Sequence, residues 1–257
     1  MTFAILGFGR FGKAFADLLV KAGHSVRVYD PAAAVPPAWA CSTAVEAVVE
    51  ASWIVLAMPV PYMRQALMQL RPHLHTGQTV IDVGSVKMEP CGLLDEVLGD
   101  AIAHVGTHPL FGPLSLARGE RPLRTVICAS ARHPEAAARA HALFETLGCE
   151  VLEQTAEAHD RVMAQTHALA FFIAKGLVDI GADDGLPAAP PSFQGMKNML
   201  AAVRGDAGHL FAAIQRENPF AAEARARLLA ELTRIHEQLE RQDDDTGLSI
   251  PEAPSSD

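Results

Sequence analysis

The sequence has few aromatic residues, few cysteines and no long apolar segment. Only 6% of its 257 residues are Phe, Trp or Tyr, and its 4 cysteines form no C-x-x-C pair. This spacing predicts no zinc site and no disulfide framework, and it is typical of buried thiols in a reducing compartment. No run approaches the roughly 20 apolar residues that span a bilayer, and the first residues lack the basic segment of a signal peptide. We therefore expect a cytoplasmic protein that does not contact a membrane.

Basic residues are outnumbered, because 21 Lys and Arg stand against 30 Asp and Glu, which gives a net charge of −9. Proteins that bind nucleic acid usually carry a basic surplus, so this balance argues against such a partner. A small anionic substrate is still compatible with it, because a site can be locally basic within an acidic protein. Hydrophobic residues make up 49% of the chain, which excludes a disordered chain and indicates one large or two small globular domains.

Residues 1–155 alternate short apolar runs with helical patterns. Several runs are apolar throughout, as in parallel strands that are covered on both faces. The expected strands are Thr2–Leu6, Ser25–Tyr29, Trp53–Ala57, Thr79–Val83, Ala103–Gly106 and Thr125–Ala129, with Val151–Leu152 as an edge strand. The expected helices are Phe11–Ala22, Thr43–Ala51, Tyr62–Leu70, Gly92–Leu98 and Pro134–Leu147. This alternation predicts an α/β fold with a doubly wound, mainly parallel sheet of the Rossmann type.

Residues 156–242 show no strand pattern and predict an all-helical domain for substrate binding and dimerisation. The expected elements are a long helix over Glu157–Gly181, a break at Pro187, Pro190 and Pro191, and helices at Phe193–Arg204, Gly208–Arg216 and Ala221–Gln242. The helices carry more apolar surface than so small a bundle buries alone, which favours a homodimer. Residues 243–257 hold five acids, two prolines and three serines, so we expect a disordered acidic tail.

A glycine motif follows the first expected strand. Gly7-Phe8-Gly9-Arg10-Phe11-Gly12 matches G-x-G-x-x-G and opens the first helix, which is the context in which this motif binds a dinucleotide. Its glycines allow a tight turn, a close approach of the pyrophosphate and close packing of helix on strand. The N–H groups at the helix N-terminus then face the phosphates. Met58 and Pro59, which follow the third expected strand, are assigned to the same site.

The acidic residue at the end of the second expected strand indicates which dinucleotide binds. Asp30 can accept hydrogen bonds from the ribose hydroxyls and would repel a 2′-phosphate. The next residues, Pro31-Ala32-Ala33-Ala34, offer no cation for such a phosphate. The sequence therefore predicts NAD as the cofactor.

Two further segments carry candidate catalytic groups at the carboxyl ends of expected strands, where ligands bind in open α/β sheets. Gly84-Ser85-Val86-Lys87 supplies a hydroxyl and a cation, and Thr107–Pro113 supplies His108. His108 is the side chain of that segment that titrates near neutrality, and we expect it in a loop stiffened by prolines. A histidine held beside a nicotinamide could accept the proton of an alcohol while the carbon gives up hydride.

Taken in order, GFGRFG with Asp30, GSVK at 84–87, THPLFGP at 107–113 and Ala158-His159-Asp160 resemble the prephenate and arogenate dehydrogenases of tyrosine biosynthesis. The resemblance covers both expected domains. It implies NAD-dependent oxidative decarboxylation of a cyclohexadienol, either prephenate to 4-hydroxyphenylpyruvate or arogenate to tyrosine.

The resemblance also implies roles for individual residues. His108 accepts the proton of the C4 hydroxyl, and Ser85 hydrogen-bonds the same region. Lys87 either orients its loop or pairs with a substrate carboxylate. His159 lies near the cleft, and Asp160 faces the amine if the substrate is arogenate.

Some family positions differ in this chain. His167 and Phe171 stand where many relatives carry a Gln and then a His on the long helix. Gln194 and Ala202 stand where the enteric enzymes carry arginines, with Lys197 and Arg204 nearby. We assign His167, Gln194, Lys197 and Arg204 to substrate binding. The candidates for the cation that binds the second carboxylate are Lys175, Lys197, Arg204, Arg118 and Arg124.

These differences affect the substrate more than the reaction type. A substrate that carries an amine, such as arogenate or 4-amino-4-deoxyprephenate, would need less positive charge than prephenate. One alternative is a β-hydroxyacid dehydrogenase or imine reductase, since those families place a catalytic lysine or another group on the first long helix, where Lys175 lies. A non-enzymatic alternative is a protein that senses NAD and has lost the chemistry.

Overall fold

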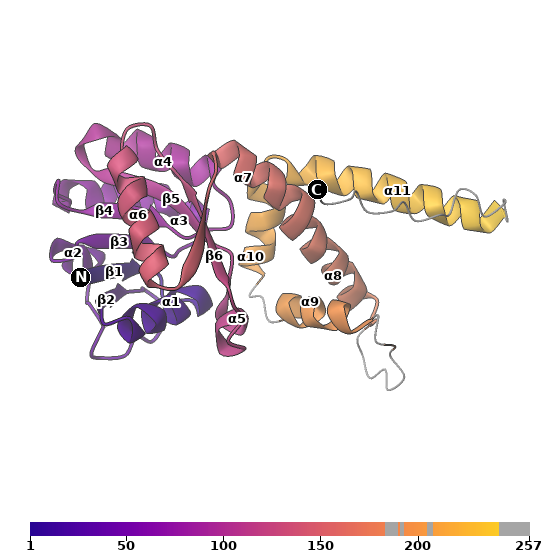
Figure 1. The fold of residues 1–257 in the computed structure, drawn as a ribbon, viewed down its shortest axis with the longest axis horizontal. Helices are drawn as coiled ribbons and strands as arrows, with labels where there is room; N and C mark the ends of the chain where they lie inside the picture. The colour runs from indigo at the N-terminus through magenta and orange to yellow at the C-terminus, as the bar shows by residue number, and fades with distance from the viewer. Residues whose placement is uncertain (183–189, 191–192, 205–207, 242–257) are drawn as a thin grey trace.

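The computed structural model describes residues 1–182, 190, 193–204 and 208–241. Pro187, Pro191 and the expected acidic tail at 243–257 lie outside these residues. Figure 1 shows a sheet covered by helices and, beside it, a group of helices that contains no strand. We call residues 1–155 the sheet region and residues 156–241 the helical region.

The sheet has seven strands in the order β2-β1-β3-β4-β5-β6-β7, and all neighbours are parallel except β5 and β6. The strands are β1 (Thr2–Leu6), β2 (Ser25–Tyr29), β3 (Trp53–Leu56), β4 (Thr79–Asp82), β5 (Ala103–Pro109), β6 (Leu123–Cys128) and β7 (Cys149–Glu153). This confirms the expected doubly wound, mainly parallel sheet. The strand order reverses between β1 and β3, so the carboxyl ends of these two strands form the crevice where ligands bind in such folds.

Helices cover both faces of the sheet, which explains why its strands are apolar throughout. One core cluster packs beneath α1 and α6, and a second packs beneath α2, α3 and α4. The helices of the sheet region are α1 (Arg10–Lys21), α2 (Ala44–Val49), α3 (Val60–Leu70), α4 (Met88–Leu98), α5 (Pro113–Ala117) and α6 (Pro134–Thr146). Short 3-10 turns follow α3 and α4 at Arg71–His73 and Gly99–Ala101.

Three expectations for the sheet region are corrected. The strand β5 continues to Pro109, so His108 lies in a strand and not in a loop; it pairs with Val126 of the antiparallel neighbour β6. The helix α4 begins at Met88 and not at Gly92, and Lys87 is its N-cap residue. The short helix α5 has no counterpart among the expected elements. Each difference arises from contacts between distant segments, which local periodicity does not record.

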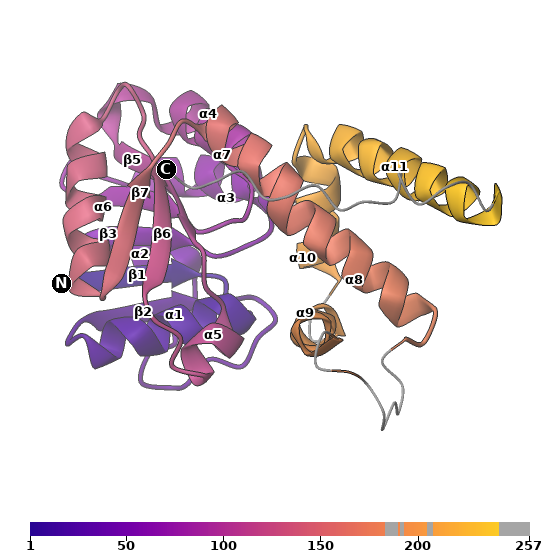
Figure 2. The ribbon, with the colours of Figure 1, turned by 45° about the vertical axis from the view of Figure 1, so that its right-hand side comes forward.

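The helical region contains α7 (Ala156–Met163), α8 (Leu169–Asp179), α9 (Gln194–Arg204), α10 (His209–Ala212) and α11 (Ala221–Arg241). Two π-helical turns interrupt it, Ala164–Ala168 between α7 and α8 and Ala213–Glu217 after α10. The long helix expected over Glu157–Gly181 is therefore continuous in direction but changes its winding in the middle. Figure 2 shows α8 and α11 diverging from the sheet region, with α9 packed beside α8. Among the described residues, no helix is both long and apolar enough to cross a membrane.

Gly106 marks a point where β5 tolerates no side chain. A Cβ atom built on Gly106 would overlap the Sγ atom of Cys91, which reaches the strand from α4. By contrast, a Cβ atom on Gly92, the residue after Cys91 in α4, would meet no heavy atom within 4 Å.

We expect Gly106→Ala to lower the free energy of unfolding by about 1–3 kcal/mol, because the added methyl group overpacks the core. Gly92→Ala is the control and should raise it by about 0.5–1 kcal/mol, since alanine favours a helix more than glycine does. Adding Cys91→Ala to the Gly106 variant should restore part of the loss. Urea unfolding followed by circular dichroism measures all three, and equal stability of the two glycine variants would contradict the packing.

Candidate active site

The glycine motif forms a cradle at the carboxyl end of β1. Gly7 has a φ angle of 107°, and a Cβ atom there would lie 2.5 Å from the carbonyl oxygen of Ala57. A Cβ atom on Gly12 would overlap the carbonyl oxygen of Gly7, so the helix packs directly on the turn. Gly9 instead faces open space, and no side chain caps the first turn of α1. The free helix N-terminus beside that space fits the pyrophosphate of a dinucleotide.

Asp30 fixes the neighbouring turn through backbone donors. Its Oδ2 accepts a hydrogen bond from the Phe8 N–H at 2.6 Å, and its Oδ1 accepts bonds from the N–H groups of Ala32 and Ala33 at 2.8 Å. Burial opposes ionisation, but the three donors outweigh it and lower the pKa of Asp30. The group is therefore an anion at the end of β2, as the predicted preference for NAD over NADP requires.

The other expected cofactor residues contribute in different ways. Phe8 is buried and its ring contacts Trp39 edge-on, while the ring of Phe11 stacks on Phe15, so both side chains pack within the protein. Arg10 is exposed at the first residue of α1. Met58 and Pro59 are half-buried between β3 and α3, across the crevice from Gly7. Direct contact of these side chains with the cofactor stays a prediction.

A buried ion pair supports the loop that carries Ser85. The Nζ atom of Lys87 donates to Oδ2 of Asp82 and to the carbonyl oxygen of Thr107, the latter at 2.6 Å, and the Lys87 side chain has 0% exposure. Asp82 also accepts bonds from the N–H groups of Gly84 and Thr107. Of the two roles expected for Lys87, this geometry fits the one that orients the loop, because the ammonium group has no exposed area for a substrate carboxylate.

A hydrogen-bonded chain of three side chains connects the sheet region with the helical region. The Nδ1 atom of His108 lies 2.8 Å from Nε2 of His159, and Nδ1 of His159 lies 2.7 Å from Oδ1 of Asp160. When both imidazole rings are neutral, His159 donates from Nδ1 to the carboxylate and accepts at Nε2, and His108 donates from Nδ1. This assignment leaves a lone pair on Nε2 of His108, the form that a general base needs.

Asp160 also holds the start of α4. Its Oδ1 accepts a bond from the Lys87 N–H at 2.8 Å, and its Oδ2 accepts one from the Met88 N–H at 2.9 Å. Its carbonyl oxygen accepts a bond from Nδ2 of Asn218 at 2.8 Å. Asp160 has 0% exposure. It was expected to face a substrate amine, but in this structure both oxygens bind protein donors instead.

The surroundings of His108 favour its neutral form. Burial lowers its pKa well below 6.5, and the positive charges that His159, Lys87 and His167 can carry lower it further. The imidazole is therefore unprotonated at neutral pH. A neutral base at that pH is ready to take a proton.

His167 lies beside His108, and Ser85 follows the neighbouring strand β4. Ser85 is half-buried in the loop between β4 and α4. The ring of His167 is nearly parallel to that of His108, with an interplanar angle of 15° and a centroid distance of 6.3 Å. Phe171, which replaces a family histidine, contacts His167 edge-on with a centroid distance of 4.6 Å.

The expected substrate cations lie on the surface of the helical region or of the sheet edge. Gln194 and Arg204 are exposed and Lys197 is half-buried on α9, which packs against α8, so their contact with substrate stays a prediction. Lys175 is exposed and pairs with Asp179. Arg118 pairs with Glu120 at 3.8 Å, and Arg124 pairs with Glu150 at 3.0 Å.

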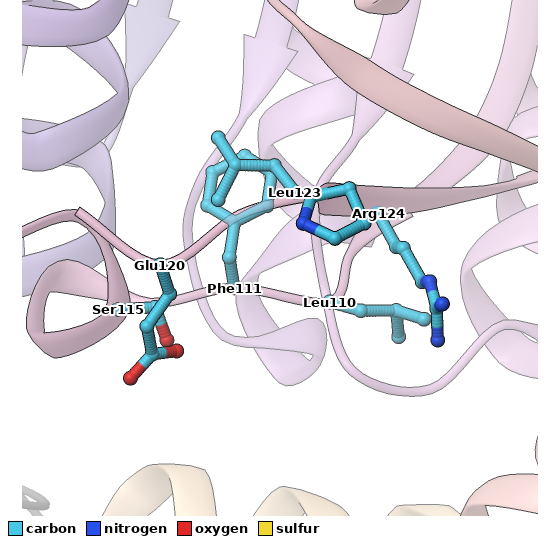
Figure 3. Close-up of a pocket in the computed structure, with 7 residues that line it drawn as sticks. Leu110, Phe111, Ser115, Glu120, Leu123 and Arg124 are labelled. Carbon is cyan, nitrogen blue, oxygen red and sulfur yellow. The ribbon is translucent and has the colours of Figure 1, made fainter. Parts of the chain in front are cut away.

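A hollow of about 380 Å³ lies at the start of β6 and next to α5. Figure 3 shows Phe111 and Leu123 side by side, with Ser115 and Glu120 at one end and Arg124 with Leu110 at the other. It begins two residues after His108 but does not include that residue. The His108 site is therefore defined by its hydrogen-bonded chain and not by this hollow.

Three residues of the site were missed from sequence. Asp82 ends an apolar strand pattern five residues before Lys87, and a charge in such a run is a signal for a buried pair. Thr107 donates its hydroxyl to the carbonyl oxygen of Asp82 at 2.6 Å. Asn218 closes the contact with α7, and nothing in its local sequence marks this role.

Comparisons with known proteins agree with this geometry. The family model for the nucleotide-binding domain of prephenate dehydrogenase matches residues 24–148. The chain is 30% identical to a 4-amino-4-deoxyprephenate dehydrogenase of Streptomyces pristinaespiralis, over 93% of this chain and 85% of that protein. It is 25% identical to the chloroplastic arogenate dehydrogenase 2 of Arabidopsis thaliana, over 89% of this chain and 67% of that protein.

Solved structures show the same fold. The prephenate dehydrogenase from A. aeolicus, in complex with hydroxyphenyl propionate and NAD+, gives a TM-score of 0.74 at 21% identity, over 95% of this chain and 92% of that one. Synechocystis arogenate dehydrogenase gives a TM-score of 0.65 at 19% identity, over 95% and 94%.

The crevice, the glycine cradle and the matched domain define a dinucleotide-binding protein of the Rossmann class, with a nicotinamide dinucleotide as its cofactor. The chain belongs to the prephenate/arogenate dehydrogenase family.

We expect Lys87→Met to lower the free energy of unfolding by about 3–5 kcal/mol, because it leaves the Asp82 carboxylate buried without its cation. Burial already raises the pKa of Asp82 against the effect of Lys87. Without Lys87 the folded protein favours protonated Asp82 more strongly, so the loss should shrink as the pH falls toward about 4, the ordinary range of an aspartate.

The control for this variant is Lys175→Met, which removes an exposed pair and should change stability by less than about 0.5 kcal/mol. Adding Asp82→Asn to the Lys87 variant should recover part of the loss. Urea unfolding at several pH values measures these differences. A Lys87 variant as stable as the Lys175 variant would contradict the buried pair.

Proposed function

We propose that this protein catalyses the NAD-dependent oxidative decarboxylation of a cyclohexadienol that carries a ring carboxylate, prephenate or arogenate, with His108 as the general base. The observation that carries the proposal is the chain from His108 through His159 to Asp160, which leaves Nε2 of His108 with its lone pair. Family membership supports the reaction class.

The hydrogen bonds to His159 and Asp160 stabilise the protonated form of His108. When Nε2 takes the proton of the C4 hydroxyl, the positive charge on His108 is shared through His159 with the Asp160 carboxylate. Before that step the base is neutral, because burial lowers its pKa. The N–H groups of Lys87 and Met88, at the start of α4, hold Asp160 in place. The three hydrogen-bonded side chains are therefore positioned before the substrate arrives.

When bound in the glycine cradle, NAD supplies the acceptor for the hydride from C4. Loss of the hydride and of the hydroxyl proton makes a dienone. The ring carboxylate then leaves as carbon dioxide, its bonding electrons complete the aromatic ring, and the carbonyl oxygen takes a proton to give the phenol. The residues of the chain therefore need to orient the C4 hydroxyl toward His108 and to leave the ring carboxylate free to depart.

We propose that Ser85 hydrogen-bonds the C4 hydroxyl of the substrate and that His167 contacts the opposite side of the substrate ring. Ser85 lies in the loop that Lys87 and Asp82 fix, and His167 lies parallel to His108. Gln194, Lys197 and Arg204 are proposed to bind the side-chain carboxylate.

A second candidate substrate is 4-amino-4-deoxyprephenate, which carries an amine on the same ring carbon. It is favoured by the 30% identity to a protein of that activity and by Phe171 in place of a family histidine. His108 would then accept a proton from the amine. The hydroxyacid dehydrogenase and imine reductase alternative is less favoured, since Lys175 is exposed and paired with Asp179.

We propose that residues 1–155 bind NAD and that residues 156–242 bind substrate and pair two copies of the chain in the cytoplasm. The helix α11 projects from the rest of the protein in Figure 1. Its Leu229, Leu232 and Leu239 are 50%, 50% and 57% exposed, and a second copy would cover them.

Purified protein should reduce NAD when given prephenate, arogenate or 4-amino-4-deoxyprephenate, and absorbance of NADH at about 340 nm measures the rate. NADP should support a lower rate because of the Asp30 anion. The relative kcat/KM values identify the substrate. No turnover with any of the three would refute the proposed function, and turnover of hydroxyacids alone would favour the alternative class.

His108→Asn should lower kcat by about 10²–10⁴-fold, the contribution of a positioned general base, and should leave the Kd for NAD unchanged. His141→Asn, an exposed histidine on α6, is the matched control and should keep wild-type activity. In the wild type, kcat/KM should stay level as the pH falls to 6.5 and should decline only below it, where His108 takes up its proton. Near-normal turnover of the His108 variant would remove it from the role of base.

A further inference from the structure

The helix that presents His167 is wound as a π-helical turn at Ala164–Ala168. Such turns are rare and occur frequently at functional sites, because the extra residue redirects the side chains around it. The second π-helical turn, Ala213–Glu217, contacts the first. The side chains between the two turns should therefore explain why both are wound in this way.

Gln215 joins the two turns. It is 6% exposed, and its Nε2 donates to the carbonyl oxygen of Ala168 at 2.6 Å. Arg225 of α11 donates from Nη1 to Oε1 of Gln215 at 2.7 Å and to its carbonyl oxygen at 2.9 Å. Since Arg225 offers only donors, it fixes which end of the Gln215 amide points to Ala168. The result is a chain of hydrogen bonds from Arg225 of α11 through Gln215 to Ala168, the residue that follows His167.

We propose that Gln215, oriented by Arg225, is a positioning residue that holds His167 parallel to His108 across the active site. The proposal rests on the proposed function for the role of His108. The ring of His167 contacts both His108 and Phe171, so a shift of the helix backbone that carries His167 would change both contacts. Gln215 bonds that backbone directly, one residue beyond His167.

The position of His167 affects the base through its charge. The groups that act on His108 come from three elements, namely His159 of α7, Lys87 before α4 and His167 of the π-helical turn, with Asp160 and Asp82 as the partners of the first two. His167 lowers the pKa of His108. If His167 moves away, this contribution is lost and water enters beside His108, and both changes raise the pKa of His108.

The test is an NMR pH titration of the His108 imidazole in the resting protein, which requires no substrate. Gln215→Met removes the donor to Ala168, and Gln215→Glu removes it while keeping the partner of Arg225. Both variants should raise the pKa of His108, as His167→Ala should. Combining Gln215→Met with His167→Ala should add nothing to the effect of His167→Ala alone. Gln238→Met on α11, where Gln238 accepts a bond from Arg234, is the matched control and should leave the titration unchanged.

Turnover gives the second readout. A displaced His167 should lower kcat by about 10–100-fold in the Gln215 variants, the size of effect that a shift of a positioning group produces. A His108 titration that matches the wild type in both Gln215 variants would overturn the proposal, even if the protein loses stability, because Gln215 would then only stabilise the helices. Inactivity of the wild type on every cyclohexadienol would refute the proposed function alone, since the titration does not depend on it.

Discussion

The hydrogen bond between His108 and His159 is the interaction on which the rest of the site depends. It joins the end of β5 to α7 and so joins the sheet region to the helical region through two imidazole rings. Asp160 sets the direction of this bond, because a carboxylate can only accept, and it takes its own position from two backbone donors of α4. The tautomer and the orientation of the proposed base therefore follow from one chain of contacts, while burial lowers its pKa.

The sequence was a good guide where a single segment determines its own structure. The glycine motif and Asp30 lie within about 30 residues of each other along the chain, each apolar strand spans only a few residues, and the rules for such segments are local. The same holds for Ser85, which follows the buried strand β4, and for His108 near the carboxyl end of β5, since the carboxyl ends of parallel strands meet at one edge. The fold class could be predicted for this reason, and the place of the chemistry at this edge stays a prediction.

Features that depend on distant partners could not be predicted. His108 lies in a strand because β6 runs antiparallel to β5 and extends the pairing to Pro109. The direction of a strand cannot be predicted from apolar periodicity. The periodicity of Glu157–Gly181 shows a helix but not its π-helical turn, which Gln215 holds from 47 residues away. Asp160 was assigned to the substrate because its position beside His159 in sequence gives no sign that Lys87 and Met88 bind it.

Asp160 lies on α7 of the helical region, but it binds the backbone N–H groups at the start of α4 in the sheet region. This contact between the regions limits how the family can change. Nucleotide-binding domains are often treated as modules that evolution can join to new partners. Here a chimaera with a foreign helical region would bring no His-Asp pair to the base and no acceptor to the first turn of α4. Such an exchange would leave the dinucleotide cradle intact and would remove the partners of His108, so the two regions can be replaced only together if the proposed base is to keep its tautomer.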